Sequence, residues 1–207
     1  MTETNTRDPF EEALIGAVFA QIARDGWWRL SIARAAGEAG LDMARARRLL
    51  PSRTSFLLRF GAQADQAALS ERPESGTAQE RLFDAIMRRL DVFQRHRAGL
   101  VVLLRALPTD PAAGALLAAA SLVSMGWLLE AAGISATGPM GMLRRKGLLA
   151  VWLWTLRAWL RDETADMAST MAALDTALAR AAQVARSLPG ETPSATADDA
   201  PAEAQPD

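Results

Sequence analysis

The chain has 207 residues, of which half are hydrophobic, and its formal net charge is −1. It contains no cysteine, which excludes disulfides, thiolate metal sites and cysteine nucleophiles. Alanine and leucine are abundant and β-branched runs are scarce, so helix is favoured over strand. We therefore expect a globular, all-α protein. The polar, acidic N-terminus lacks the apolar segment of a secretory signal, which predicts a cytoplasmic location.

Charge is distributed unevenly along the chain. Eight arginines and only three acidic residues lie between Arg24 and Phe60, whereas the segment after Pro189 holds five acidic residues and no base. The basic stretch fits either a solvated surface or a face that binds nucleic acid. The segment 189–207 is rich in Pro, Ala and Thr and has no large hydrophobe to bury, so we predict a disordered tail.

The first predicted helix begins at Asp8-Pro9 and ends at Asp25-Gly26. Asp can cap free amides, Pro suits the first helical position, and Gly is a common stop. Apolar residues then recur at a spacing of four on one face, which predicts that the helix packs against a core. These residues are Phe10, Leu14, Val18 and Ile22.

Two short helices are predicted next, over 32–38 and 43–50. Ser31 can cap the first and Asp42 the second, with Gly40 between them and Pro51 after them. A tight turn containing Gly between two short helices is typical of a helix-turn-helix, whose second helix enters the major groove of DNA. A fourth helix should cover 54–70. We place an N-terminal helix-turn-helix domain at 1–60, with 1–8 flexible.

The rest of the chain predicts a second helical domain at 61–188. The segment 72–76 is a break, and Thr77 with Glu80 forms a capping box that opens the next helix. Further helices are expected over 97–107 and from Asp110-Pro111, then after a loop at 133–139 through residue 161, and finally over 162–187. The total is about nine helices.

The stretch 26–60, GWWRLSIARAAGEAGLDMARARRLLPSRTSFLLRF, resembles the DNA-binding end of TetR-family transcriptional regulators. Ser31, Ala39-Gly40-Leu41 and Leu50-Pro51-Ser52-Arg53 fill the places of the family's motifs. The family's usual Tyr-x-His-Phe run is replaced by Arg47-Arg48-Leu49-Leu50, and an arginine contacts phosphate at least as well as a tyrosine. The resemblance implies a TetR-like fold and a palindromic DNA operator. The expected DNA contacts are Ser31, Met43, Arg45, Arg47, Arg48 and Arg53.

A second resemblance concerns the C-terminal half. The run 159–164, Trp-Leu-Arg-Asp-Glu-Thr, and the later Leu174-Asp175 are similar to a pattern of the ubiquinone-biosynthesis accessory family, which shares the TetR fold. That resemblance implies an alternative function, in which the protein holds an isoprenoid lipid and does not bind DNA. The family's membrane-binding terminal helix is replaced here by the acidic tail.

The segment 111–129 has no charged residue and approaches the length that spans a bilayer. Its small residues and its amphipathic neighbours favour a buried central helix over an integral membrane segment. The large hydrophobic residues expected around it, which lack clustered polar groups, either fill the core or line a pocket for a hydrophobic small molecule or lipid effector. They are Phe83, Met87, Leu90, Leu103, Leu107, Met125, Trp127, Leu128, Trp152 and Leu156.

The last two helices carry apolar stripes that could face a second copy of the chain. TetR-like proteins dimerise through a four-helix bundle there, and two recognition helices read a palindrome. The alternative is that both stripes pack within one chain. The predicted homodimer contacts are Leu149, Leu153, Leu160, Met171, Leu174 and Leu178.

Nothing in the sequence indicates catalysis. His96 is the single histidine, in a polar junction without a second His or Cys nearby, so a surface or capping role is expected rather than metal binding. No Gly-x-Ser-x-Gly elbow, phosphate-binding glycine loop or His-Glu-x-x-His motif occurs. We expect no enzyme activity, no cofactor and no metal. A helical dimer that neither binds DNA nor carries lipid is the third possibility.

Overall fold

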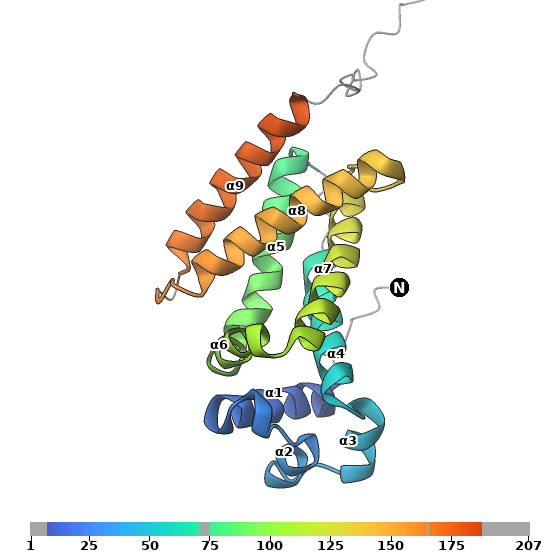
Figure 1. Cartoon of the computed structure of the whole chain (residues 1–207), viewed down its shortest axis with the longest axis vertical. Helices are drawn as coiled ribbons and strands as arrows, with labels where there is room; N and C mark the ends of the chain where they lie inside the picture. The colour runs from blue at the N-terminus through green and yellow to red at the C-terminus, as the bar shows by residue number, and fades with distance from the viewer. Residues whose placement is uncertain (1–7, 71–74, 165, 188–207) are drawn as a thin grey trace, which may run out of the picture.

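The computed structural model describes residues 8–70, 75–164 and 166–187. Over these residues the chain forms nine α-helices and two short 3-10 helices without a strand (Figure 1), which confirms the all-α prediction. The predicted disordered tail and, apart from Asp8, the predicted flexible N-terminus lie outside the described residues.

The N-terminal helices follow the predicted caps closely. Helix α1 covers Pro9–Asp25, α2 covers Ile32–Glu38 and α3 covers Met43–Leu49, with the 3-10 helix η1 at Trp27–Arg29. Each of the three α-helices begins after a side chain that accepts a hydrogen bond from a backbone amide of the first turn, as in helix capping. Those caps are Asp8, Ser31 and Asp42.

The turn between α2 and α3 depends on Gly40. Its φ is +66°, a left-handed conformation in which a Cβ would be strained. The Leu41 amide donates to the Ala36 carbonyl at 2.9 Å, which closes the end of α2 and sends the chain into α3. The glycine of the predicted helix-turn-helix therefore has a defined conformational role.

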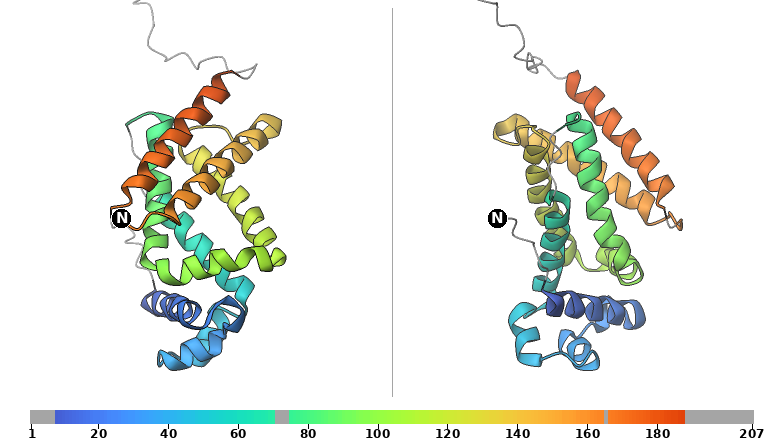
Figure 2. Two further views of the ribbon diagram at one scale, coloured as in Figure 1. Left: turned by 60° about the vertical axis from the view of Figure 1, so that its left-hand side comes forward. Right: turned by 180° about the vertical axis from the view of Figure 1, so that it is seen from behind.

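Helix α4 covers Arg53–Leu69 and connects the two halves of the molecule. It begins with a capping box between Ser52 and Ser55. From there it rises into the C-terminal half beside α7, as the views in Figures 1 and 2 agree. The predicted domain boundary at residue 60 therefore falls inside a continuous helix.

The C-terminal half contains the remaining helices. The predicted capping box of Thr77 and Glu80 opens the first of them, and each of its two hydrogen bonds is formed. The bounds are Ala78–Arg95 for α5, Arg97–Ala106 for α6, Leu107–Thr109 for the 3-10 helix η2, Pro111–Ala131 for α7, Gly138–Trp159 for α8 and Ala168–Arg186 for α9.

The last helix begins six residues later than predicted, because Asp162 organises a turn before it. Its carboxylate accepts hydrogen bonds from the hydroxyl of Thr164 at 2.6 Å and from the amide and hydroxyl of Thr170, each at 2.8 Å. Arg97 donates to the carbonyl oxygens of Trp159 and Asp162 at 3.0 and 2.6 Å. The Trp-Leu-x-Asp-x-Thr run therefore forms the joint between α8 and α9.

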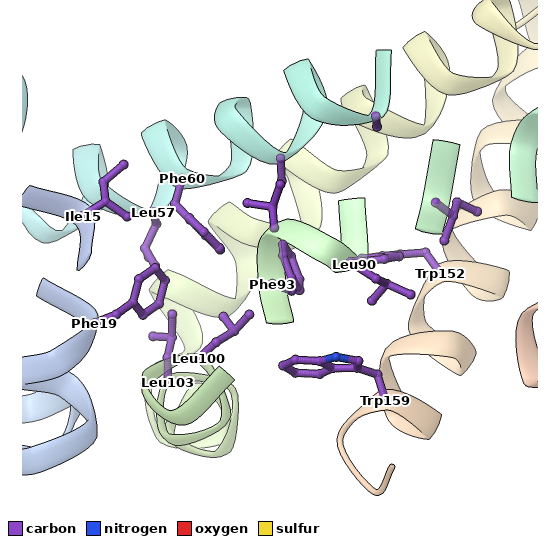
Figure 3. Packing of buried hydrophobic residues seen from close by; sticks show 14 of the residues in the cluster. Ile15, Phe19, Leu57, Phe60, Leu90, Phe93, Leu100, Leu103, Trp152 and Trp159 are labelled. Atoms are coloured by element: carbon purple, nitrogen blue, oxygen red, sulfur yellow. The ribbon is translucent and has the colours of Figure 1, made fainter. Parts of the chain in front are cut away.

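A chain of aromatic rings joins the two halves (Figure 3). The ring of Phe19 on α1 lies 4.7 Å from that of Phe60 on α4, and Phe60 lies 5.4 Å from Phe93 on α5. Phe93 in turn contacts Trp152 and Trp159 on α8 edge-on, at 5.4 and 6.2 Å. These pairs stabilise the fold through apolar burial and ring geometry. The hydrophobic core is thus continuous from the helix-turn-helix to α8.

His96 belongs to the same junction. Its ring stacks on Phe19 at a centroid distance of 4.8 Å and meets Phe60 edge-on. Burial lowers the pKa of His96, and the nearby charge of Arg95 lowers it further. Over the described residues, no group of three or more His, Asp or Glu side chains is placed to hold a metal ion. His96 is the residue at which α5 ends and α6 begins, which agrees with the expected capping position, and its half-buried ring also packs against Phe19 and Phe60.

Helix α7 was expected to be a buried central helix, and it is buried on one side only. Met125 and Leu128 face the core, whereas Val123 and Trp127 are exposed. Among the described residues, α7 is the one helix long and apolar enough to cross a membrane, by length and composition alone. A third of its most apolar window is buried in the molecule, where α7 packs against α4, α5 and α8.

Replacing Asp162 by Ala should lower the free energy of unfolding by about 1–3 kcal/mol, because the buried amide and hydroxyl of Thr170 lose their acceptor. These hydrogen bonds lower the pKa of Asp162 to about 2, with that of the Thr164 hydroxyl contributing most. The stabilisation should therefore be complete above pH 4 and disappear as the pH falls through about 2.

Urea denaturation of the wild-type and Asp162→Ala proteins between these pH values measures the difference in their free energies of unfolding. Asp175→Ala is the matched control, because Asp175 is exposed and should change stability by less than about 0.5 kcal/mol. An Asp162→Ala effect that does not shrink in acid would contradict the assignment.

Candidate nucleic-acid interface

Helix α3 lies at the end of the molecule farthest from α9, with one face turned to solvent (Figure 1). Ala46 and Leu50 are buried one turn apart and hold α3 against the domain. Ala44 and Arg48, also one turn apart, lie on the opposite side of the helix and are exposed. The exposed face of α3 is therefore presented away from the body of the protein.

Two arginines of α3 carry charge that no acid among the described residues neutralises. Arg48 is exposed and forms no hydrogen bond or ion pair with any described residue. Arg47 is exposed and donates to the carbonyl oxygen of Pro51, a neutral acceptor. Both guanidiniums can contact an anion such as a phosphate group.

Arg45 has a different environment, because the N-terminus of α1 lies beside α3. Its guanidinium pairs with Asp8 at 2.5 Å and lies 4.3 Å from the ring centre of Phe10. Asp8 also caps α1 through its other oxygen, which accepts from the Phe10 amide at 3.1 Å. This ion pair joins the start of α1 to α3, and the DNA contact of Arg45 stays a prediction.

Arg53 also has a structural position. Its guanidinium donates to the carbonyl oxygens of Trp28 and Leu30, each at 2.9 Å, and lies 5.5 Å from the ring centre of Trp27. These bonds tie the first turn of α4 to η1. Its side chain is half-buried, and the DNA contact of Arg53 stays a prediction.

The basic charge of this domain is smaller than the sequence between Arg24 and Phe60 indicates. Arg59 pairs with Glu11 through two hydrogen bonds of 2.5 and 2.6 Å, and Asp8 neutralises Arg45. Glu11 lies on α1 and Asp8 directly precedes it, so both acids come from outside the basic stretch. Asp25 and Glu38 neutralise Arg24 and Arg34. The arginines of this stretch without an acidic partner, within the described residues, are Arg29, Arg47, Arg48 and Arg53.

Between α2 and α3 the chain forms a cleft of 480 Å³, which brings together four of the six predicted DNA contacts. The Ser31 hydroxyl caps α2 by accepting from the Arg34 amide at 3.3 Å, and Met43 is half exposed on the facing wall. The four residues are Ser31, Met43, Arg47 and Arg53.

The residues predicted to line an apolar pocket pack mainly as core. The fully buried ones are Leu90, Leu103, Met125, Leu128 and Trp152, and the partly buried ones are Phe83, Met87, Leu107 and Leu156. Trp127 is 66% exposed and lines, with Leu128, an open cleft of 360 Å³ between α4, α5 and α7. Phe83 lines an open cleft of 380 Å³ between α5 and α9.

The expectation that this region lacks clustered polar groups is wrong. Arg89 on α5 is only 4% exposed, and its guanidinium pairs with Asp65 on α4 and lies 4.8 Å from the Trp152 ring centre. The Ser124 hydroxyl of α7 donates to the other oxygen of Asp65 at 2.5 Å. Burial lowers the pKa of Arg89, and Asp65 opposes that shift.

The sequence holds a signal for this cluster. Position 89 continues the spacing of Leu82, Ile86 and Phe93 on the buried face of α5, so an arginine stands in an apolar stripe. A charge in such a position needs a buried partner, and the partner comes from another helix.

The predicted dimer residues divide into two groups. Leu174 and Leu178 are buried in the chain's own core, which contradicts a role at a partner surface. Leu149, Leu160 and Met171 are partly buried. Leu153 is 55% exposed, and the adjacent Trp154, which the sequence analysis did not select, is equally exposed.

No family model matches the sequence, and no curated protein matches it. Solved structures with similar folds are found. A TetR transcriptional regulator from Nitrosomonas europaea superposes with a TM-score of 0.70 at 20% identity, over 85% of this chain and 99% of the other. One from Rhodococcus sp. RHA1 superposes with a TM-score of 0.55 at 15% identity, over 83% and 94%. The chain has the TetR fold, as predicted.

Arg53, which bonds to two backbone carbonyls, should contribute more to stability than Arg48, which has no partner among the described residues. Arg53→Ala removes a charged donor from two backbone carbonyls and should lower the free energy of unfolding by about 1–3 kcal/mol. Arg48→Ala should change it by less than about 0.5 kcal/mol. Urea denaturation of the two variants measures both values, and equal effects would refute the distinction.

Proposed function

We propose that the chain is a DNA-binding transcriptional regulator that presents α3 to the major groove. The observation that carries the proposal is the charge of α3's exposed face. Arg47 and Arg48 have no acidic partner there, whereas the other arginine of α3, Arg45, pairs with Asp8. The TetR fold supports the same function, because both solved neighbours are described as transcriptional regulators.

Only a few arginines of the N-terminal domain lack an acidic partner among the described residues. This small number affects how strongly the domain can bind DNA. The affinity that comes from phosphate contacts grows with the number of phosphates neutralised, so a single copy of this domain would bind DNA weakly. Two copies joined by symmetry would double the contacts and read a palindrome. The proposal therefore includes a homodimer.

We place the dimer contact on the outer side of α8. Leu143, Leu153 and Trp154 are exposed there, with Gly147 and Ala150 on the same side of the helix. An exposed apolar face of this kind is typical of an interface between protein chains. This surface retains Leu153 from the sequence prediction and replaces the buried Leu174 and Leu178.

The lipid-binding alternative has less support. The Trp-Leu-x-Asp-x-Thr pattern that carried it is accounted for by packing, because Trp159 is buried and Asp162 bonds to Thr164 and Thr170. A protein that carries lipid and does not bind DNA would show no salt-dependent DNA binding, which makes this alternative an outcome of the following experiment.

Titration of fluorescent DNA from the gene's own upstream region, at about 50 and 200 mM salt, should show binding that weakens with salt. Arg48→Ala and Arg47→Ala should each weaken it by about 1–3 kcal/mol for a base contact, or lower the salt slope by about 1 for a phosphate contact. Arg186→Ala is the matched control, because it removes the same charge at the far end of α9. Absence of binding at the lower salt concentration would refute the regulator function.

Trp154→Glu should convert the dimer to a monomer, because it places a charge in the centre of the proposed apolar contact. Sedimentation velocity measures the change directly. Val123→Glu is the matched control, since Val123 is similarly exposed but lies on α7. A Trp154→Glu protein that stays dimeric, or a wild-type chain that is monomeric at micromolar concentration, would contradict the placement.

A further inference from the structure

We propose that Asp8 limits the affinity of the protein for DNA, because its carboxylate competes with DNA for the guanidinium of Arg45 on α3. The inference rests on the proposed DNA-binding function. It adds to that function a residue outside α3 that determines which arginine of α3 is available to DNA.

Arg45 has the position at which a recognition helix contacts DNA. It lies in the first turn of α3, whereas Arg47 and Arg48 lie in the last turn. The N-terminal residues of a recognition helix are those that contact base edges in the major groove. Arg45 also precedes Arg48 by three residues, so the two are neighbours on the helix surface. A free guanidinium at position 45 would suit a phosphate oxygen or the edge of a guanine.

The start of α1 holds this arginine in place. A guanidinium nitrogen of Arg45 lies 2.5 Å from one carboxylate oxygen of Asp8, and the guanidinium carbon lies 4.3 Å from the centre of the Phe10 ring. The other oxygen of Asp8 accepts from the Phe10 amide at 3.1 Å and caps α1. Asp8 is thereby fixed beside α3, where it offers Arg45 an anionic oxygen of the kind that a DNA phosphate would offer.

The ion pair is accessible, so an anion outside the protein can compete for Arg45. The side chains of Arg45 and Asp8 are 44% and 35% exposed. Ion pairs of this kind are weak, and breaking one costs at most about a factor of five in an equilibrium constant. That cost is subtracted from the binding of DNA whenever Arg45 changes partner, so Asp8 and DNA oppose each other through the same guanidinium.

The other acids in the first turn of α1 differ from Asp8. Glu11 accepts two hydrogen bonds from Arg59 of α4, at 2.5 and 2.6 Å, and its side chain is only 17% exposed. This bidentate, shielded pair is a structural contact between α1 and α4. Glu12 is exposed, and its side chain forms no hydrogen bond or ion pair with a described residue. Asp8 is therefore the acid of this segment whose removal would free an arginine of α3.

The pair of Asp8 with Arg45 also joins α1 to α3, and that structural role alone predicts the opposite result. If the pair served only to hold α3 in position, loss of the Asp8 charge would loosen α3 and would weaken DNA binding or leave it unchanged. If Asp8 competes with DNA, the same loss should strengthen binding. The sign of the change in affinity separates the two roles.

Asp8→Asn tests the competition, because asparagine caps a helix as well as aspartate does and carries no charge. In the DNA titration at about 50 mM salt, it should tighten binding about fivefold for each chain bound. Arg45→Ala in the Asp8→Asn background should abolish this gain, because the gain requires the released guanidinium. Glu12→Gln is the matched control. It removes the same charge four residues after Asp8 without freeing an arginine, and should tighten binding by less than about twofold.

Asp8→Ser, which also supplies a helix cap without charge, provides a second variant, and thermal melts check that each variant is folded. Wild-type or weaker affinity in both Asp8→Asn and Asp8→Ser would overturn the competition. A gain no larger than that of Glu12→Gln, or a gain that persists after Arg45 is removed, would overturn it as well.

Retention on heparin, a sulfated polyanion, tests the release of Arg45 without any operator DNA. Asp8→Asn should elute at a higher salt concentration than Glu12→Gln, and adding Arg45→Ala should remove the difference. If no variant binds the upstream DNA but this elution order is observed, the regulator function is refuted and the competition for Arg45 stands. Equal elution of Asp8→Asn and Glu12→Gln would overturn the competition whether or not DNA binds.

Discussion

The contact between the rings of Phe19 and Phe60 is the constraint on which the arrangement of the molecule depends. It joins α1, which packs beside the helix-turn-helix, to α4. Phe93 extends the same series of aromatic contacts to α5 and α8. Gly99 allows α6 to approach α1 closely, because a Cβ there would lie 2.3 Å from the Phe19 carbonyl oxygen. The two halves therefore share one core, and a movement of one helix in this junction must be passed to its neighbours.

Helix α4 is the element through which this core connects the N-terminal helices to the C-terminal half. Its first turn is fixed by the capping box of Ser52 and by Arg53, which holds the carbonyls of η1. Its last two turns are held by Arg88 and Arg89 of α5. Contacts at its first turn are thus made with the N-terminal helices, and contacts at its last two turns are made with α5.

Electrostatics reinforce the division of roles among the arginines. Asp8 and acids of α1 and α2 neutralise the arginines that connect the N-terminal helices to one another. Arg47 and Arg48, on the exposed face of α3, have no acidic partner among the described residues. In the other half, Arg89 is buried with Asp65 and Ser124, where its charge links three helices. The surroundings of each arginine therefore decide whether its charge is neutralised within the chain.

The sequence by itself determined the helices, because caps, glycine stops and proline starts act within a few residues. Asp8, Ser31, Asp42 and the Thr77–Glu80 box all begin helices where they were expected to, and the fold class follows from them. Only the tertiary structure decided which side chains are free. Pairing of Arg45 with Asp8, of Arg89 with Asp65, and of Asp162 with Thr170 depends on helices that meet in space, as does burial of Leu174. Local spacing contains no information about such partners, because each interaction forms only when distant segments pack together.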